Sequence, residues 1–156
     1  MNKTRASNVF RNKKKTMERL YTAKATSSGG RKGCVQTDDG VLSLTLCMPN
    51  EHSNFKSEKC TNPEQLFACA YASCFLSALN FILKKEHLPC DNTKVDIAVH
   101  LNATEKQHYL SVDMNVYMPG IEINTAKKAL HLADHICPYS KAIRNNVEVN
   151  FNVTVD

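Results

Sequence analysis

The sequence predicts an α+β domain in which a mostly antiparallel sheet packs on a long central apolar helix and a shorter second helix. Three observations predict this class: several strand-length segments with alternating apolar residues, one helix-length segment without charge, and a second segment with helical spacing. With 156 residues, 42% hydrophobic and 22% charged, the chain has the size and composition of a single globular domain with a core of its own.

The first predicted strands lie within residues 20–49, where strand-forming residues are interrupted by turn residues. A Gly-Gly pair at 29–30 indicates one turn, and the Asp-Asp-Gly triplet at 38–40 predicts a hairpin. The sequence VLSLTLC, which follows the triplet, alternates apolar and polar side chains as a half-buried strand does. Residues 50–61 are polar and mixed in charge, so we expect a loop there.

A central helix is predicted for about residues 62–86. Residues 65–83 carry no charged side chain, and residues suited to helix ends flank them. These flanking residues are Thr61 or Asn62 as the cap, Pro63 at the first helical position, Glu64 in the first turn, and Lys84 and Lys85 in the last turn.

The uncharged run also approaches the length of a membrane span, about 20 residues. Its hydrophobicity is diluted by alanines and by four polar residues, Gln65, Ser73, Ser77 and Asn80, so we expect a core helix and no membrane span. A helix that is apolar on every side must be covered on every side. One chain with two helices does not supply that cover, so the pattern predicts a homodimer.

Two strands with period-two alternation follow, at 95–101 and 110–118, and we expect them to be antiparallel neighbours. A Pro-Gly pair then breaks the chain. Residues 124–136 have helical spacing, and this helix should end before Pro138, which disfavours a helical conformation for the residue preceding it. Alternating apolar residues at 147–153 predict the last strand.

The net charge of +5 is concentrated at the start of the chain. Residues 1–16 hold six basic and no acidic side chains, so we expect a basic, disordered extension before one domain at 17–156. A charge confined to such an extension does not predict a nucleic-acid-binding face. The extension lacks the apolar core of a secretory signal, and the cysteine count of seven is odd. Both features favour a cytoplasmic protein without a disulfide framework.

Three motifs in order resemble one known family. LYTAKATSSGGRKG resembles its opening strand and arginine turn, NPEQLFACAYASCF its central helix, and CPYSKAIRNN its second cysteine motif. The family is that of the organic hydroperoxide resistance proteins, a branch of the osmotically inducible protein C superfamily, and the resemblance covers about residues 19–156. The chain departs from the family at Cys69 and Ala70, where Ala-Gly is usual, and at Lys32, where an acid is common.

The resemblance implies a thiol peroxidase that reduces organic hydroperoxides to alcohols. Cys74 matches the peroxidatic cysteine, which would pass through a sulfenic acid, and Cys137 matches the resolving cysteine, which would close a disulfide with it. Arg31 matches the activating arginine, and Glu64 the carboxylate that holds it. The resemblance also implies an intertwined homodimer with sites at its interface. It further implies that a dihydrolipoyl-type dithiol, carried on a lipoyl-bearing protein, reduces the disulfide. No bound metal or cofactor is implied.

The residues around Cys74 independently require a fixed cation. Its helical neighbours are apolar, and desolvation raises a thiol pKa. A cation at 4 Å would stabilise the thiolate by roughly 4 kcal/mol at an effective dielectric of 20, or about three pKa units. Ten residues of straight helix separate Glu64 from Cys74 by about 15 Å. Arg31 therefore meets both only if the helix bends, or if Arg31 or Glu64 comes from the partner subunit.

The remaining aromatic and cysteine residues of interest fall into two groups. Aromatic residues near Cys74 predict an apolar pocket suited to an organic tail, and these are Phe67, Tyr71, Phe75 and Phe81. Four further cysteines are expected to be inert, buried residues, and these are Cys34, Cys47, Cys69 and Cys90.

Three alternatives stand beside the peroxidase. His131 and His135, with Cys137 just after them, have a spacing that occurs in zinc sites. A cysteine hydrolase would pair Cys74 with a histidine, although a mid-helix cysteine offers no free backbone N–H groups for an oxyanion hole. The alternative outside enzymes is a non-catalytic ligand-binding or redox-sensing dimer of the same fold.

Overall fold

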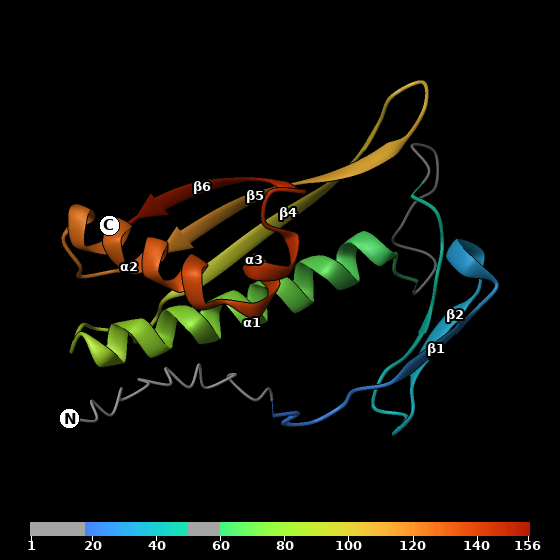
Figure 1. Cartoon of the computed structure of the whole chain (residues 1–156), viewed down its shortest axis with the longest axis horizontal. Coiled ribbons are helices and arrows are strands. Elements are labelled where there is room, and N and C mark those ends of the chain that lie inside the picture. The colour runs from blue at the N-terminus through green and yellow to red at the C-terminus, as the bar shows by residue number, and fades with distance from the viewer. Residues whose placement is uncertain (1–17, 50–59) are drawn as a thin grey trace, which may run out of the picture.

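The computed structural model describes residues 18–49 and 60–156. Their helices and strands form two parts, called here the arm and the body (Figure 1). The arm, residues 25–46, contains β1 (Ala25–Ser28), the 3-10 turn η1 (Gly30–Lys32), β2 (Cys34–Thr37) and β3 (Ser43–Thr45). The body, residues 63–154, contains α1 (Pro63–Lys85), β4 (Lys94–Ala103), β5 (His108–Tyr117), α2 (Ile123–Ile136), α3 (Pro138–Ile143) and β6 (Glu148–Thr154). The predicted α+β class is confirmed. The predicted extension at 1–16, and most of the predicted loop at 50–61, lie outside the described residues.

The strands form two separate three-stranded sheets. In the arm, β2 pairs antiparallel with both β1 and β3. In the body, β5 pairs antiparallel with β4 but parallel with β6. The parallel pairing is possible because α2 and α3 lie between β5 and β6 and carry the chain back to the same end of the sheet. The predicted antiparallel character therefore holds for every pairing except that of β5 with β6.

The register of the body sheet aligns the apolar faces of its strands. Ile97 of β4 lies opposite Met114 of β5, and Val99 lies opposite Val112, as expected for neighbouring antiparallel strands. β6 continues the face with Val149 beside Val112. Both Met114 and Val112 are fully buried. The body core therefore forms between this face of the sheet and the helices.

α1 begins and ends as its sequence predicts. The Asn62 side chain caps it by accepting a hydrogen bond from the Gln65 backbone N–H at 2.8 Å, and Pro63 occupies the first helical position. The buried side chains recur at helical spacing and form one stripe that faces the core. They are Tyr71, Phe75, Ala78, Leu79, Ile82 and Leu83.

The side of α1 that faces away from the core is left exposed by the described residues, and it is of mixed polarity, with Gln65, Cys69, Ser73, Ser77 and Phe81 along it. Among the described residues, α1 is the one helix long and apolar enough to cross a membrane by length and composition. Instead it packs against β4 and α2 in the body (Figure 1). Only 33% of its most apolar 18-residue window is buried, and Phe81 is 61% exposed. The described residues thus leave part of the apolar surface of α1 uncovered.

The second helix ends where predicted, but the residues after it form a helix that the sequence did not predict. α2 stops at Ile136, and Cys137 adopts an extended conformation, as expected for a residue before proline. Pro138 then occupies the first position of α3, where its fixed φ angle and missing N–H suit a helix start. Pro138 therefore ends one helix and begins another, which places Cys137 at a sharp corner.

The arm carries an arginine on a turn built from glycines. Gly29 has a φ angle of 71°, a left-handed value that favours glycine, and it precedes η1 and Arg31. A Cβ atom at Gly33 would lie 1.8 Å from the Ser28 carbonyl oxygen, so this position tolerates no side chain. β1 is exposed throughout, and Leu46 is the buried apolar residue of the arm.

Candidate redox site

Two free cysteines from different elements meet in the body. Cys74 lies in the middle of α1, and Cys137 is the corner residue between α2 and α3. Their Sγ atoms are 3.6 Å apart, in contact but not bonded. Disulfide sulfurs lie about 2.05 Å apart, so a movement of about 1.5 Å would join them. The two cysteines that the sequence singles out are therefore positioned to react with each other.

The corner that carries Cys137 is fixed against α1 by aromatic and polar contacts. The buried Tyr71 hydroxyl lies 2.9 Å from the Ser140 Oγ atom. The Tyr139 ring stacks on the Tyr71 ring, with centroids 6.1 Å apart and planes inclined by 19°. Burial raises the pKa of Tyr71, so its hydroxyl stays protonated and available for hydrogen bonding. These contacts from the first turn of α3 hold Cys137 over Cys74.

The surroundings of Cys74 oppose its ionisation within one chain. Burial raises the pKa of the Cys74 thiol, and the adjacent Cys137 thiol raises it further, whereas the Tyr139 backbone lowers it by hydrogen bonding. Among the described residues of the same chain, no cation contributes to this balance. The net effect of the described groups around Cys74 is therefore to raise its pKa.

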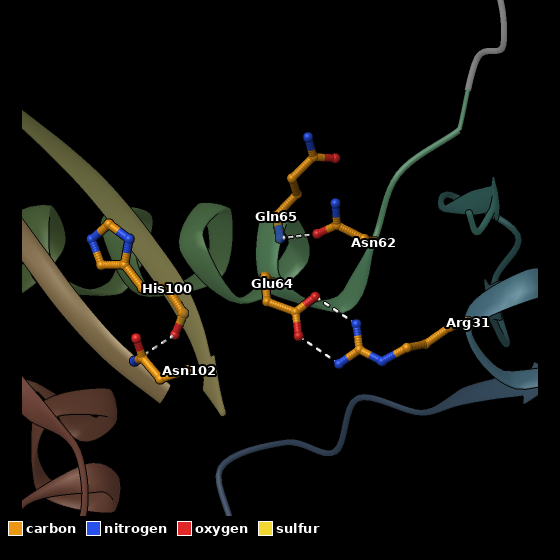
Figure 2. Close-up of polar contacts among 6 residues, drawn as sticks. All are labelled: Arg31, Asn62, Glu64, Gln65, His100 and Asn102. Atoms are coloured by element: carbon orange, nitrogen blue, oxygen red, sulfur yellow. Dashed lines mark hydrogen bonds and ion pairs between the residues drawn. The ribbon is translucent and has the colours of Figure 1, made fainter. Parts of the chain in front are cut away.

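The predicted partners Arg31 and Glu64 are themselves joined. The two guanidinium NH groups of Arg31 donate to both Glu64 carboxylate oxygens, at 2.7 and 2.5 Å (Figure 2). Figure 2 shows Arg31 reaching from the arm to the first turn of α1. Arg31 lowers the pKa of Glu64, and Glu64 raises that of Arg31, so both remain charged. The ion pair fixes the orientation of the guanidinium.

The ion pair and the thiol pair occupy different places in the single chain. Glu64 stands at the start of α1 and Cys74 ten residues later, about 15 Å along a continuous helix. Arg31 is bound to Glu64 at that end of α1. The structure thus brings together Arg31 with Glu64 and Cys74 with Cys137, but not the four residues in one chain.

Two hollows flank the ion pair. One of about 460 Å³ is lined by Arg31 and Glu64 together with Met48, Pro49, Asn62, Gln65, Ala68, Ile97, Val99 and Leu101. The other, of about 380 Å³, is lined by both charged residues together with Pro63, Phe67, Leu101, His108, Tyr109 and Leu110. Each combines a charged pair with apolar walls from α1 and the body sheet. Sequence reasoning missed the contribution of β4 and β5, because it depends on how the strands pack against α1.

Residues 56–152 match the family described as OsmC-like protein. This chain belongs to the OsmC-like family. A relative from Staphylococcus epidermidis named organic hydroperoxide resistance protein-like 1 is 41% identical over 138 residues, which are 86% of this chain and 96% of that protein. An uncharacterized protein of Acinetobacter baylyi is 36% identical over 139 residues, 88% of this chain and 95% of that protein.

Solved structures of the OsmC-like family share the fold. An organic hydroperoxide resistance protein from Legionella pneumophila has 40% identity and a TM-score of 0.80, and the match covers 88% of this chain and all 100% of that one. The organic hydroperoxide resistance protein OhrB of Bacillus subtilis has 36% identity and a TM-score of 0.80, with 87% and 100% covered. The resemblance predicted from three sequence motifs is therefore confirmed.

The four predicted pocket aromatics of this OsmC-like protein occupy different environments. Tyr71 and Phe75 are fully buried in the core, where they pack against each other edge to face. Phe67 lines the smaller hollow, and Phe81 is exposed on the far part of α1. Among the described residues, the four do not share one environment, and the pocket that they would form stays a prediction. Helical periodicity placed them near Cys74, but it did not reveal which of them the body sheet would cover.

The spare cysteines of this OsmC-like protein require a correction. Cys47 was expected to be an inert buried thiol, but it is bonded to Cys60 in a disulfide with a sequence separation of 13. Cys34 and Cys69 are free and exposed rather than buried, and Cys90 is half-buried. No local sequence signal marks Cys47 and Cys60 as partners, because their proximity depends on how the arm returns to α1.

The two helical histidines approach each other without a third ligand. The Nε2 atoms of His131 and His135 are 3.1 Å apart on the exposed face of α2. The described part of the chain contains no cluster of three or more metal-ligating side chains. Cys137, the third member of the predicted zinc site, is fully buried and contacts Cys74 instead. The zinc alternative is left with two ligands.

Proposed function

We propose that this OsmC-like protein is a thiol-dependent peroxidase that reduces organic hydroperoxides to alcohols. The observation that carries the proposal is the 3.6 Å contact between the Cys74 and Cys137 sulfurs. A peroxidase of this kind needs one thiol that is oxidised and a second that can reach it. Relatives named for resistance to organic hydroperoxides, at about 40% identity, support the same chemistry.

In the first step, the Cys74 thiolate attacks one oxygen of the hydroperoxide. A sulfur–oxygen bond forms as the oxygen–oxygen bond breaks, and the alkoxide leaves and takes up a proton to become the alcohol. Cys74 is then a sulfenic acid. Cys137 loses its proton and attacks the Cys74 sulfur, the hydroxyl leaves with that proton as water, and a Cys74–Cys137 disulfide forms.

An external dithiol completes the cycle. Two thiol–disulfide exchanges transfer two electrons and two protons to the Cys74–Cys137 pair and leave the dithiol oxidised. A dihydrolipoyl group, on a carrier protein, is the dithiol we propose. No metal or bound cofactor takes part in this scheme. A cytoplasmic location, where such dithiols are kept reduced, remains a prediction.

The activating cation comes from a second copy of the chain. Within one chain Arg31 is held at Glu64, about 15 Å along α1 from Cys74, and burial raises the pKa of Cys74. Exposed apolar surface on α1, such as Phe81, and the exposed arm both need a further surface. An intertwined homodimer that places the ion pair of each subunit beside the partner's Cys74 meets both needs.

The two hollows beside the ion pair favour a substrate with an organic tail. Their walls are largely aliphatic or aromatic, with Arg31 and Glu64 as the charged members. An alkyl or aryl group gains free energy from burial there, at about 25 cal/mol per Å² of apolar surface, whereas hydrogen peroxide has no such surface. Arg31 can donate a hydrogen bond to the peroxide oxygens.

The reduced protein, treated with one equivalent of cumene hydroperoxide, tests the redox pair. Intact mass should fall by two hydrogens, and peptide mapping should place the new bond between Cys74 and Cys137. Cys137→Ser should stop at a Cys74 that carries one extra oxygen, while Cys90→Ser, which changes a free cysteine outside the pair, should behave as the wild type does. A bond that maps elsewhere would refute the assignment.

Turnover with dihydrolipoamide distinguishes an enzyme from a sensor. A peroxidase consumes hydroperoxide in proportion to the dithiol supplied, and Cys74→Ser reduces this to the uncatalysed rate. A redox-sensing dimer would form the disulfide without sustained turnover. A ligand-binding protein would keep its affinity for the hydroperoxide after Cys74→Ser and would show no oxidation.

A further inference from the structure

We infer that the Cys47–Cys60 disulfide is a redox-sensitive clamp that positions Arg31 for the proposed peroxidase reaction, on which this inference rests. The bond joins the residue that follows the arm to a residue two positions before Asn62, the cap of α1. It therefore links the part of the chain that carries Arg31 to the part that carries Glu64. Cys47 and Cys60 act as positioning residues and touch no reacting atom.

A short path of backbone contacts leads from the disulfide to Arg31. Leu46, next to Cys47, donates its backbone N–H to the Gly33 carbonyl oxygen at 2.8 Å. Gly33 closes the 3-10 turn on which Arg31 sits. Because Leu46 is also buried, a displacement of Cys47 would move this turn.

An equally short path leads from the disulfide to Glu64. Cys60 precedes Thr61, which makes two backbone hydrogen bonds to the end of the arm. The Cys47 N–H donates to the Thr61 carbonyl oxygen at 2.9 Å. The Thr61 N–H donates to the Thr45 carbonyl oxygen, also at 2.9 Å. Glu64 follows three residues later in the first turn of α1. One covalent bond thus lies within a few residues of each member of the ion pair.

Few other contacts hold the arm to α1 within the described chain. Leu46 and Thr61 form a single isolated bridge, which is too short to be stable alone. β1 is exposed along its length, and the arm has little core of its own. Without the disulfide, the bridge and the Arg31–Glu64 pair would have to fix the arm themselves. Met48 and Pro49, which line the larger hollow beside the ion pair, would lose the same restraint.

The clamp is open to the reductant that the proposed cycle consumes. Cys47 and Cys60 are both half-buried rather than enclosed, so a dithiol can approach their sulfurs. Reduction breaks the sulfur–sulfur bond, delivers two electrons and two protons to form two thiols, and leaves the dithiol as its cyclic disulfide. The reverse exchange with an oxidised dithiol restores the clamp. The position of Arg31 thus depends on the redox state of the dithiol pool.

The double variant C47S/C60S tests the clamp, with C34S/C90S as a matched control that removes two free cysteines. The readout is the pH dependence of alkylation of Cys74, followed by peptide mass spectrometry. We expect the half-alkylation pH of C47S/C60S to rise by about one unit, which lowers the thiolate fraction at neutral pH about tenfold. The control should match the wild type. An unchanged pH profile in C47S/C60S would refute the clamp.

The same measurement in an Arg31→Ala background shows whether the clamp acts through Arg31. If it does, C47S/C60S adds no further shift once Arg31 is removed, because the two effects are not additive. Equal shifts in both backgrounds would refute the positioning role and indicate a general loosening of the fold. Circular dichroism establishes that each variant is folded. Mild reduction of the wild type with a dithiol breaks the Cys47–Cys60 bond without any substitution and gives a second protein to compare.

Failure of the proposed function has a different signature. A wild-type protein that turns over no organic hydroperoxide refutes the peroxidase, whatever the alkylation profiles show. A wild type that turns over hydroperoxide, with a C47S/C60S variant of equal kcat/KM and equal pH profile, refutes the clamp and leaves the peroxidase intact.

Discussion

The body and the arm of this chain are stabilised in different ways. The body buries one face of α1 against a sheet whose central strand, β5, is fully covered at Val112 and Met114. The arm has three short strands, an exposed β1 and a single buried apolar residue, Leu46. The body therefore has a hydrophobic core of its own, whereas the arm depends on contacts with other parts of the protein.

The proposed chemistry is divided along the same line. The thiols that would react lie in the body, where packing by Tyr71 and Tyr139 fixes their separation. The cation that would activate them lies in the arm and is held by a salt bridge, a disulfide and a short bridge. Under the proposed function, the placement of the arm sets the reactivity of the thiols, while the core sets the geometry of the thiol pair.

Removal of the arm's cation should have the largest effect. Arg31→Ala should lower the rate of hydroperoxide reduction at neutral pH by about a thousandfold, because a cation near the thiolate is worth about three pKa units. The pH at which Cys74 becomes reactive should rise in parallel. Arg31→Lys keeps the charge but loses the two-pronged contact with Glu64, and we expect an intermediate rate.

A mixture of two inactive variants shows which subunit supplies the cation. After Arg31→Ala and Cys74→Ser chains are unfolded and refolded together, each mixed dimer has one complete site if Arg31 acts on the partner's Cys74. Mixed dimers make up about half of the population, so activity should return to about a quarter of the wild-type value. No recovery would mean that Arg31 and Cys74 act within one chain.

A core substitution in the body should cost far more stability than a similar one in the arm. Leu79 is fully buried on α1, so Leu79→Ala should lower the free energy of unfolding by about 2–5 kcal/mol. Leu42 lies beside β3 and is 49% exposed, so Leu42→Ala should lower the free energy of unfolding by about 0.5 kcal/mol or less. Urea unfolding of both variants provides the comparison. If Leu42→Ala lowered the free energy of unfolding as much as Leu79→Ala does, the arm would belong to a buried core.

The elements that sequence predicted best are those fixed by local chemistry. The bounds of α1 follow from Asn62, Pro63 and the two terminal lysines, and the facing strands β4 and β5 follow from alternation. α3 was missed because a proline that ends one helix can also begin another, and Pro138 does both. β6 was predicted as a strand, but its parallel direction was not, because strand direction depends on the path of the chain between strands.

Within the site, the sequence predicted the residues better than it predicted their grouping. The helix separation of Glu64 and Cys74 indicated that one chain would not unite them, and the structure agrees. The pairing of Cys47 with Cys60 could not be predicted, because it depends on a long-range return of the arm. Tyr71 and Phe75 are buried in the core, which periodicity could not reveal because it identifies a helix face but not what covers it.

The junction between arm and body should be moderately sensitive to the cap of α1. Asn62 is 5% exposed, and its side chain accepts the Gln65 N–H, so Asn62→Ala should cost about 1 kcal/mol of stability. Asn62→Ser retains an acceptor and should recover most of the loss. Urea unfolding measures both. If the serine variant is as unstable as the alanine variant, burial of the amide rather than capping is the role of Asn62.

The smallest expected effect is a pH dependence at the ion pair that joins arm to body. Arg31 lowers the pKa of Glu64 from its ordinary value of 4.5. The contribution of the pair to stability is therefore complete above that ordinary value and is lost as pH falls through the lowered one. Because the Arg31 side chain is 37% exposed, solvent screening should keep the contribution to about 1 kcal/mol or less.

Unfolding of the wild type and of Glu64→Gln between pH 7 and pH 3 measures that contribution. The wild type should be the more stable at pH 7, the difference should narrow as pH falls, and added salt should reduce it. Glu105→Gln, on an exposed glutamate between β4 and β5, is the control and should show no such narrowing. A difference that stays constant with pH would mean that Glu64 joins arm to body by shape and hydrogen bonding alone. In that case charge would not help to place Arg31.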